Sequence, residues 1–379
     1  MKVNFNKIPI SGRELDYIKK AMDSGHLQGD GAFLKICEET IGKITGAKAS
    51  LVTTSCTSAL DMSALLCNIE AGDEVIVPTY TFVSSVNSFV LRGAKPVFCD
   101  IRPDTLNIDE TKIPELITDR TKVIVPVHYA GVGCEMDTIM DIAKKSGIKV
   151  VEDAAQGFCA YYRGRHLGTF GDMGALSFHS TKNVIAGEGG ALLCNDPSLV
   201  DRAYFIREKG TNRIHFVEGK IDKYTWVDYG SSYIPSELIT AFLAAQLEIA
   251  KKLTDERVAA WNYYRDRLAP LERAGKIATA KIPSECKHNA HIFFILTESA
   301  ETTKALADFL KKREIATNSH YAPLHNCPMA KELGCSDRPL PVAEKLAKTM
   351  LRLPIYSSIT PDEQDWVAES VAAFFGERL

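Results

Sequence analysis

The chain has 379 residues, more than one hydrophobic core of ordinary size requires, so two domains are expected. Hydrophobic residues make up 45% and charged residues 25% of the sequence, which is typical of a globular protein. A formal net charge of -3 leaves no basic excess, which argues against nucleic acid or a membrane surface as a partner.

The sequence carries no signal for export, membrane insertion or metal binding. Residues 1–17 hold no apolar segment of the signal-peptide type, and no run reaches the roughly 18 apolar residues of a spanning helix. None of the ten cysteines forms a C-x-x-C pair, so reduced thiols in a cytoplasm are expected. The H-x-x-H of His288 and His291 has no acidic partner, and no metal site is predicted.

The first 155 residues predict helices alternating with buried strands. Ser11-x-x-Glu14 is a capping-box pattern that predicts a helix to about Met22. Short apolar runs then alternate with segments of helical length, which is typical of a mostly parallel sheet with helices on both sides. The runs are SLVTT (50–54), EVIVP (74–78), PVFCD (96–100), KVIVPVHY (122–129) and KVVED (149–153).

The remaining elements predict a second, smaller unit. GALSFHS (174–180) and GGALLCND (189–196) are expected to be neighbouring strands at one edge of the sheet. One long helix is predicted from about Ser236 to Leu268, followed by a charged helix around 301–313 and a last helix near 362–376. We therefore expect an α/β fold with a large domain over residues 1–248 and a small α+β domain over 249–379.

Lys182 lies in an unusual setting for a lysine. It follows an apolar run with interspersed hydroxyls and precedes the glycine-dense turn 187–190. Asp153 ends the predicted strand KVVED, one strand earlier. Because ligands of such sheets bind at the carboxyl ends of strands, both side chains are expected to face one crevice.

This pair suits pyridoxal phosphate. A lysine amine binds the aldehyde of that cofactor, and a carboxylate keeps its pyridine nitrogen protonated. Desolvation and the cationic ring would lower the pKa of Lys182. The hydroxyl-rich stretch TTSCTSAL (53–60) leads into a predicted helix, whose free N–H groups and positive dipole end suit the phosphate.

Each feature also has a plainer explanation by itself. Asp153 is equally explained as a helix N-cap, residues 53–60 as simple capping, and Lys182 as an ordinary loop lysine. The turn 187–190 is a weak phosphate loop, because no G-x-G-x-x-G is present. Only their conjunction, in this order on one sheet, favours a cofactor site.

Six stretches together resemble the DegT/DnrJ/StrS family of sugar-nucleotide aminotransferases, over nearly the whole chain. The resemblance implies a fold-type I pyridoxal-phosphate enzyme, with pyridoxamine phosphate as intermediate. It also implies a homodimer with active sites at the subunit interface, acting on L-glutamate and a nucleotide sugar. The stretches are SCTSAL (55–60), PTYTFVSSVNSFVLRGAKPVFCDI (78–101), PVHYAGVGCEMD (126–137), VVEDAAQG (150–157), GDMGALSFHSTKN (171–183) and GEGGAL (187–192).

The resemblance assigns roles around the cofactor ring. Lys182 would be the Schiff-base lysine and Asp153 the partner of the pyridine nitrogen. Gln156 would lie by the ring hydroxyl, and Phe82 would stack on the ring. Taken alone, Phe82 is equally explained as a core residue.

The resemblance also assigns phosphate contacts. They are the backbone N–H groups of Cys56 and Thr57 and the hydroxyls of Thr57 and Ser177. In the family, an asparagine in a G-x-N-x-R-M stretch reaches the phosphate of the neighbouring subunit. Here the corresponding stretch is 230–235, and Ser232 stands in the place of that asparagine, with a shorter reach.

Further stretches resemble one subgroup, which aminates C4 of dTDP-4-keto-6-deoxyglucose to give dTDP-4-amino-4,6-dideoxygalactose for O-antigen or enterobacterial common antigen. They are EMDTIM (135–140), FIREKGTNR (205–213), DKYTWVDYGSSY (222–233) and HYAPLHNCP (320–328). The last stretch implies that His320, Tyr321 and His325 contact the sugar.

Three other functions stay open. A 3-keto sugar aminotransferase differs only in its substrate. Related dehydratases, which use the same cofactor, carry histidine at the position of the lysine, so Lys182 favours amino transfer. A non-catalytic regulatory protein on the same scaffold would not need Lys182 and Asp153, and both are present.

Overall fold

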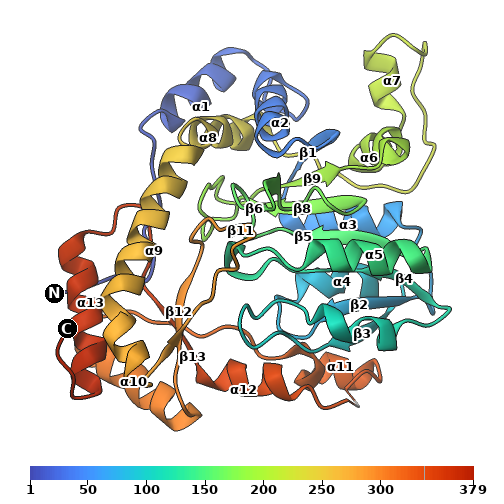
Figure 1. The fold of residues 1–379 in the computed structure, drawn as a ribbon. Helices are drawn as coiled ribbons and strands as arrows, with labels where there is room; N and C mark the ends of the chain where they lie inside the picture. Colours follow the sequence, from blue (N-terminus) through green and yellow to red (C-terminus); the bar gives the residue numbers. More distant parts are fainter. Residues whose placement is uncertain (337) are drawn as a thin grey trace.

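The computed structural model describes residues 1–336 and 338–379, and its largest element is a seven-stranded sheet (Figure 1). The strand order is β1-β9-β8-β5-β4-β2-β3. Strands from β8 to β3 run parallel, whereas β9 is antiparallel to both β8 and β1. The strands are β1 Ala49–Thr53, β2 Glu74–Pro78, β3 Lys95–Cys99, β4 Thr121–Ile124, β5 Lys149–Asp153, β8 Met173–Ser177 and β9 Gly190–Cys194.

Helices cover both faces of this sheet, which explains why its strands are continuous apolar runs. In β2, Val75 and Val77 pack with α3 and α4, whereas Ile76 between them packs on the opposite face with α5. The helices of the first 248 residues are α1 Glu14–Asp23, α2 Ala32–Thr45, α3 Cys56–Leu66, α4 Ser84–Val90, α5 Met136–Ser146, α6 Val200–Arg207, α7 Arg213–Val217 and α8 Glu237–Glu248.

The C-terminal residues build a second, antiparallel sheet in the order β10-β12-β13. It shares a hydrophobic cluster with α9, α10, α12 and α13, and Val3 joins this cluster from the N-terminus. The elements are α9 Ala250–Arg273, β10 Ala278–Thr279, β12 Phe293–Leu296, α10 Ala300–Lys312, α11 Pro328–Glu332, α12 Pro341–Thr349, β13 Met350–Leu353 and α13 Pro361–Phe374. A small third sheet joins β11 (Cys286–Lys287) to β6 (Tyr161–Tyr162) and β7 (Arg165–His166).

The helix predicted from Ser236 to Leu268 is wrong as a single element. Ile249 leaves helical geometry, with φ −105° and ψ 8°, and separates α8 from α9. The apolar spacing continues through the break because Ala250 and Leu253 in the first turn of α9 still pack in the same cluster as α8. Leu243 of α8 packs with α2 and the main sheet, whereas Leu268 of α9 packs with the small sheet. We propose that the domain boundary lies at this break, after residue 248.

Two other elements also differ from expectation. β8 and β9 are neighbours, but they do not form an edge, because β1 pairs with the free side of β9. The capping box is half formed: Glu14 Oε1 accepts the N–H of Ser11 at 2.6 Å, but the Ser11 hydroxyl accepts from Arg13 instead of Glu14. The helix therefore begins at Glu14 rather than after Ser11.

Within residues 1–336 and 338–379, no helix combines the length and apolarity needed to cross a bilayer. The same residues contain no group of three or more histidine, cysteine or acidic side chains placed to hold a metal ion. All ten cysteines are free thiols.

Gly190, at the start of β9, allows a close approach between β9 and the first turn of α3. A Cβ at this position would lie 2.4 Å from the backbone nitrogen of Cys56 and 2.6 Å from the carbonyl oxygen of Ser55. Both neighbours are backbone atoms and cannot rotate away. Any larger side chain must therefore push β9 away from α3.

We predict that Gly190→Ala lowers the free energy of unfolding by about 1–3 kcal/mol through this overpacking. Urea denaturation of the purified protein measures the change. Gly42→Ala in helix α2 is the matched control, because its Cβ would meet only Ser50 Oγ at 3.7 Å. This control should be neutral or stabilising by about 0.5–1 kcal/mol. Equal stability of both variants would contradict the proposed close approach.

Candidate active site

A cavity of about 610 Å³ opens beside the carboxyl ends of β5 and β8, and residues of the C-terminal sheet form its other wall. It brings together most of the residues predicted from the sequence. Those that line it are Cys56, Thr57, Phe82, Asp153, Gln156, Ser177, Lys182, His320 and Tyr321. Phe82 is 58% exposed at the cavity, which excludes the alternative of a core residue.

Asp153, the last residue of β5, presents a firmly held carboxylate to this cavity. Its Oδ2 accepts a hydrogen bond from the hydroxyl of Ser85 at 2.6 Å, and its Oδ1 accepts from the backbone N–H of Ala155 at 3.0 Å. Because Ser85 donates to the carboxylate, it accepts from Thr81 Oγ1, which lies 2.7 Å away. No helix follows Asp153 over residues 154–160, so the N-cap explanation is wrong.

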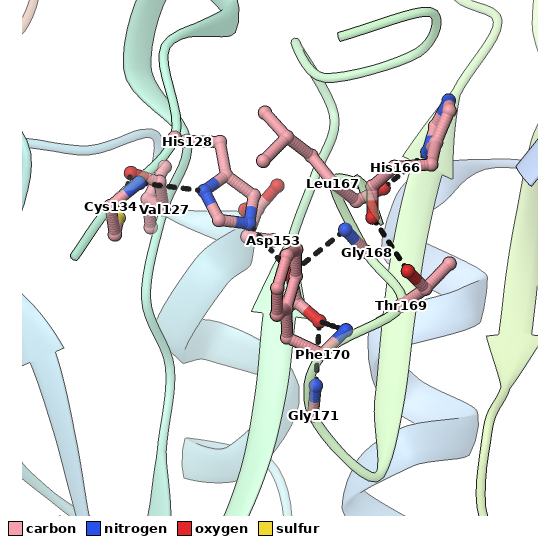
Figure 2. A network of polar contacts seen from close by, with 12 residues as sticks. Val127, His128, Cys134, Asp153, His166, Leu167, Gly168, Thr169, Phe170 and Gly171 are labelled. Atoms are coloured by element: carbon pink, nitrogen blue, oxygen red, sulfur yellow. Dashed lines mark hydrogen bonds and ion pairs between the residues drawn. The ribbon is translucent and has the colours of Figure 1, made fainter. Parts of the chain in front are cut away.

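Glu152, the neighbour of Asp153, anchors the same strand end on the other face, and Figure 2 labels its partners His128, Gly168, Phe170 and Gly171. Its fully buried carboxylate accepts from His128 Nε2 at 2.8 Å. The Nδ1 atom of His128 accepts the N–H of Cys134, so this histidine is neutral and protonated on Nε2. Three backbone N–H groups complete the set of donors to Glu152, those of Gly168, Phe170 and Gly171.

Lys182 follows β8, and its half-buried side chain reaches the cavity. Burial is the main influence on the amine and lowers the pKa of Lys182, although the nearby Cys56 and Asp153 act in the opposite direction. Within the described residues, Nζ has no hydrogen-bond or ion-pair partner. An amine that loses its proton at lower pH and has no hydrogen-bond partner is suited to nucleophilic attack and proton transfer.

The first turn of α3 presents free backbone N–H groups and a helix N-terminus at the cavity, as an anion site would require. Ser55 caps the helix by accepting the N–H of Ser58 at 3.0 Å. The N–H groups of Cys56 and Thr57 have no acceptor within the described chain, and both residues line the cavity. Burial raises the pKa of the Cys56 thiol well above its ordinary value, so no thiolate repels an anion there. Ser177 adds a hydroxyl at the same cavity.

These groups fit pyridoxal phosphate by their chemistry. The free N–H groups of α3 suit a phosphate, the Asp153 carboxylate suits a protonated ring nitrogen, and the Lys182 amine suits an aldehyde. Gln156 is fixed beside them, since its Oε1 accepts the N–H of Ala130 at 2.7 Å. The exposed ring of Phe82 offers a stacking face.

The wall contributed by the C-terminal residues combines His320 and Tyr321, which the sequence predicted, with Arg352, which it did not. His320 stacks on Tyr321 with ring centroids 4.1 Å apart, and its Nε2 accepts from Arg352. Tyr321 in turn accepts from Gln156 Nε2 at 3.3 Å. One sequence signal existed for Arg352, because it interrupts the apolar run MLRLPIY (350–356). Ser85 gave no such signal.

Two predicted contacts lie outside the cavity. His325 is buried, and its ring nitrogens meet Thr79 Oγ1 at 2.7 Å and Glu344 Oε1 at 3.1 Å, so we do not retain it as a substrate contact. Ser232 is exposed, bridges in backbone to Glu208, and does not line the cavity of its own chain.

Comparisons with known proteins show which family this chain resembles. A model of the DegT/DnrJ/EryC1/StrS aminotransferase family matches residues 9–372. GDP-perosamine synthase of Escherichia coli O157:H7 is 29% identical over 370 residues, which cover 97% of each chain. The spore coat polysaccharide biosynthesis protein SpsC of Bacillus subtilis is 30% identical over 370 residues, covering 96% of this chain and 95% of SpsC.

A solved structure extends the likeness to three dimensions. The crystal structure of DesV from S. venezuelae matches with a TM-score of 0.89 and 28% identity, covering 100% of this chain and 99% of DesV. The chain therefore belongs to the DegT/DnrJ/EryC1/StrS aminotransferase family, as a pyridoxal-phosphate enzyme of fold type I.

Proposed function

We propose that this aminotransferase moves the amino group of L-glutamate to C4 of a nucleotide-linked 4-keto-6-deoxyhexose. The specific reaction proposed converts dTDP-4-keto-6-deoxyglucose to dTDP-4-amino-4,6-dideoxygalactose. The observation that carries the reaction type is the convergence of Lys182 and Asp153 on one cavity beside the free N–H groups of α3. The subgroup stretches within residues 135–140, 205–213, 222–233 and 320–328 support the sugar and its nucleotide.

Lys182 and Asp153 divide the chemistry. The bound cofactor supplies an electron sink that makes the Cα proton of an amino acid acidic. Asp153, whose carboxylate is fixed by Ser85, would accept a hydrogen bond from the ring nitrogen and would keep that nitrogen protonated. Lys182 would hold the aldehyde carbon until the donor displaces it, and its freed amine then moves the proton from the donor Cα.

In the second half of the cycle, the same amine would deliver a proton to C4 of the sugar. His320 and Tyr321, whose rings stack on each other, line the same cavity as Lys182, and we propose that they orient the sugar. Burial, followed by the charges of Arg352 and Lys182, lowers the pKa of His320 to about 2. His320 is therefore a neutral hydrogen-bonding group and not a proton donor.

We further propose a homodimer in which Ser232 reaches the phosphate site of the other subunit. The segment that carries Ser232 supports this, because it exposes large apolar side chains that a partner would cover. They are Phe216, Val217, Tyr224, Trp226, Val227 and Tyr229.

A GDP-linked sugar is the second candidate substrate. It is favoured by the name of the relatives from Escherichia coli and Caulobacter vibrioides, GDP-perosamine synthase, with 29% and 32% identity respectively. The residue chemistry of the cavity does not separate the two nucleotides.

Incubation with L-glutamate and a panel of dTDP- and GDP-linked 3-keto and 4-keto sugars tests the substrate. We expect 2-oxoglutarate and a galacto-configured 4-amino sugar from the dTDP-linked 4-keto substrate, identified by NMR. Amination of only a GDP-linked sugar would move the assignment to the second candidate. Amination of only 3-keto sugars would refute the proposed position on the ring.

Lys182→Ala should lower the turnover number by at least about 10³-fold, because both the covalent anchor and the proton-transferring amine are lost. The variant should still bind pyridoxamine phosphate, whose phosphate and ring nitrogen are held by other residues. Coupled detection of 2-oxoglutarate and equilibrium dialysis of the cofactor measure the two properties. Lys251→Ala on the exposed face of α9 is the control. A rate close to the parent's would show that Lys182 has another role.

In cofactor-free protein, Lys182 should react with an aldehyde at lower pH than an exposed lysine. Its pKa is lowered by burial, so the reactive neutral amine forms earlier as pH rises. The pKa of Lys251 is raised by its hydrogen bond to Asp255, so Lys251 should need a higher pH than Lys182 to react. Reductive methylation at a series of pH values, followed for each lysine by peptide mass spectrometry, gives the pH of half-maximal reaction for Lys182 and for Lys251. A Lys182 midpoint at or above that of Lys251 would contradict this ordering.

A further inference from the structure

Arg352 places a cation in the cavity from the middle of an apolar strand. It belongs to β13, where its neighbours in sequence, Leu351 and Leu353, are buried. Its backbone is held on one side by Phe294 of β12 and on the other by Asn318, whose carbonyl oxygen accepts the Arg352 N–H at 2.8 Å. The backbone of Arg352 is therefore paired on both sides, and its side chain lines the cavity.

The guanidinium of Arg352 has few partners for its five N–H donors. One nitrogen, Nη1, donates to Nε2 of His320, which is a neutral acceptor. The Nε atom is buried and has no hydrogen-bond partner. The cation also lies 4.7 Å from the ring centroid of Phe5, and it forms no ion pair with any carboxylate of the described residues.

Arg257, which lines the same cavity, shows what a satisfied buried arginine looks like here. Its Nε donates to the carbonyl oxygen of Ala290 at 3.1 Å, and its Nη2 donates to that of His291 at 2.7 Å. Arg257 therefore ties the backbone together, whereas Arg352 keeps free donors. A largely buried guanidinium without an anion is costly, and a bound anion removes that cost.

The carboxylates of this chain do not supply that anion. Asp153 is already held by Ser85 and by the N–H of Ala155. Glu188, the other acidic residue at the cavity, is exposed and lies 3.5 Å from His179 Nε2. A ligand must bring the negative charge.

We propose that Arg352 binds the α-carboxylate of the amino donor, an inference that rests on the proposed function. The donor's α-carboxylate is bonded to the same carbon as the amino group that must reach Lys182, and Arg352 and Lys182 line one cavity. The diphosphate of a nucleotide sugar is separated from the reacting C4 by the whole sugar ring. A guanidinium and a carboxylate can form two parallel hydrogen bonds, which fixes the orientation of Cα as well as its place.

This role predicts that Arg352 serves one half-reaction only, because a keto sugar carries no charge near C4. In Arg352→Met, glutarate, a dicarboxylate that lacks the amino group, should bind the cofactor-loaded enzyme about 30-fold more weakly in a calorimetric titration. The glutamate half-reaction should require a similarly higher glutamate concentration for half-saturation in single turnovers. The keto-sugar half-reaction, started from the pyridoxamine form, should change less than about twofold.

Two further variants serve as a charge-conserving comparison and as a control. Arg352→Lys keeps the positive charge but cannot form two parallel hydrogen bonds to a carboxylate, so it should bind glutarate more tightly than Arg352→Met and more weakly than the parent. This variant also tests the proposal if Arg352→Met does not fold. Arg273→Ala, on the exposed end of α9, should bind glutarate as the parent does. Thermal melting and cofactor absorbance establish that each variant is folded and loaded.

Glutarate binding by Arg352→Met that equals the parent's would overturn the proposal. A loss confined to the keto-sugar half-reaction would also overturn it, and would assign Arg352 to the diphosphate. If the parent aminates no keto sugar, the proposed function fails, but the glutarate titration still decides whether Arg352 binds a carboxylate.

Discussion

The end of strand β5 buries two adjacent carboxylates, and the donors that satisfy them fix the rest of the site. Because side chains alternate along a strand, Glu152 and Asp153 face opposite sides of the sheet. Glu152 takes its donors from His128 and from the backbone of residues 168–171, which leads directly into β8. Lys182 follows β8. By fixing residues 168–171, the buried carboxylate of Glu152 therefore fixes where β8 begins, and β8 leads to the amine of Lys182. Burying the Glu152 carboxylate without its donors would cost roughly several kcal/mol. The segment 168–171, which supplies three of these donors, therefore has little conformational freedom.

The cavity is completed by groups from distant parts of the chain, each with one kind of charge. The main sheet gives the anion Asp153, and α3 gives free N–H groups. The small sheet gives Arg352, and the loop between α10 and α11 gives the neutral wall of His320 and Tyr321. Neither sheet alone offers both a site for the cofactor and a site for a substrate anion. The two sheets must therefore keep their relative position for the reaction that we propose.

The sequence predicted those parts that depend on local pattern. Continuous apolar runs identified the buried strands, and the order of residues 53–60, Asp153 and Lys182 along them placed all three at one edge of the sheet. What it missed depends on pairing between distant segments. No sequence motif marks Ser85, yet its hydroxyl donates a hydrogen bond to Asp153, which is 68 residues away. His325 shared a promising loop with His320 but turns inward to Thr79, and only the packed structure shows which histidine faces the cavity.

A single cavity that handles both an amino acid and a sugar must accept a charge in one half-reaction and none in the other. The contact between Arg352 and His320 meets this demand. While a carboxylate is present, the free N–H groups of Arg352 can bind it. When the donor leaves, Nη1 keeps its hydrogen bond to the neutral ring of His320, so the cation is never without any partner. Burial, and after it the positive charge of Arg352, lowers the pKa of His320 and holds that ring neutral. A neutral histidine is thus what allows a charged arginine to stay in a site that alternately holds a neutral ligand.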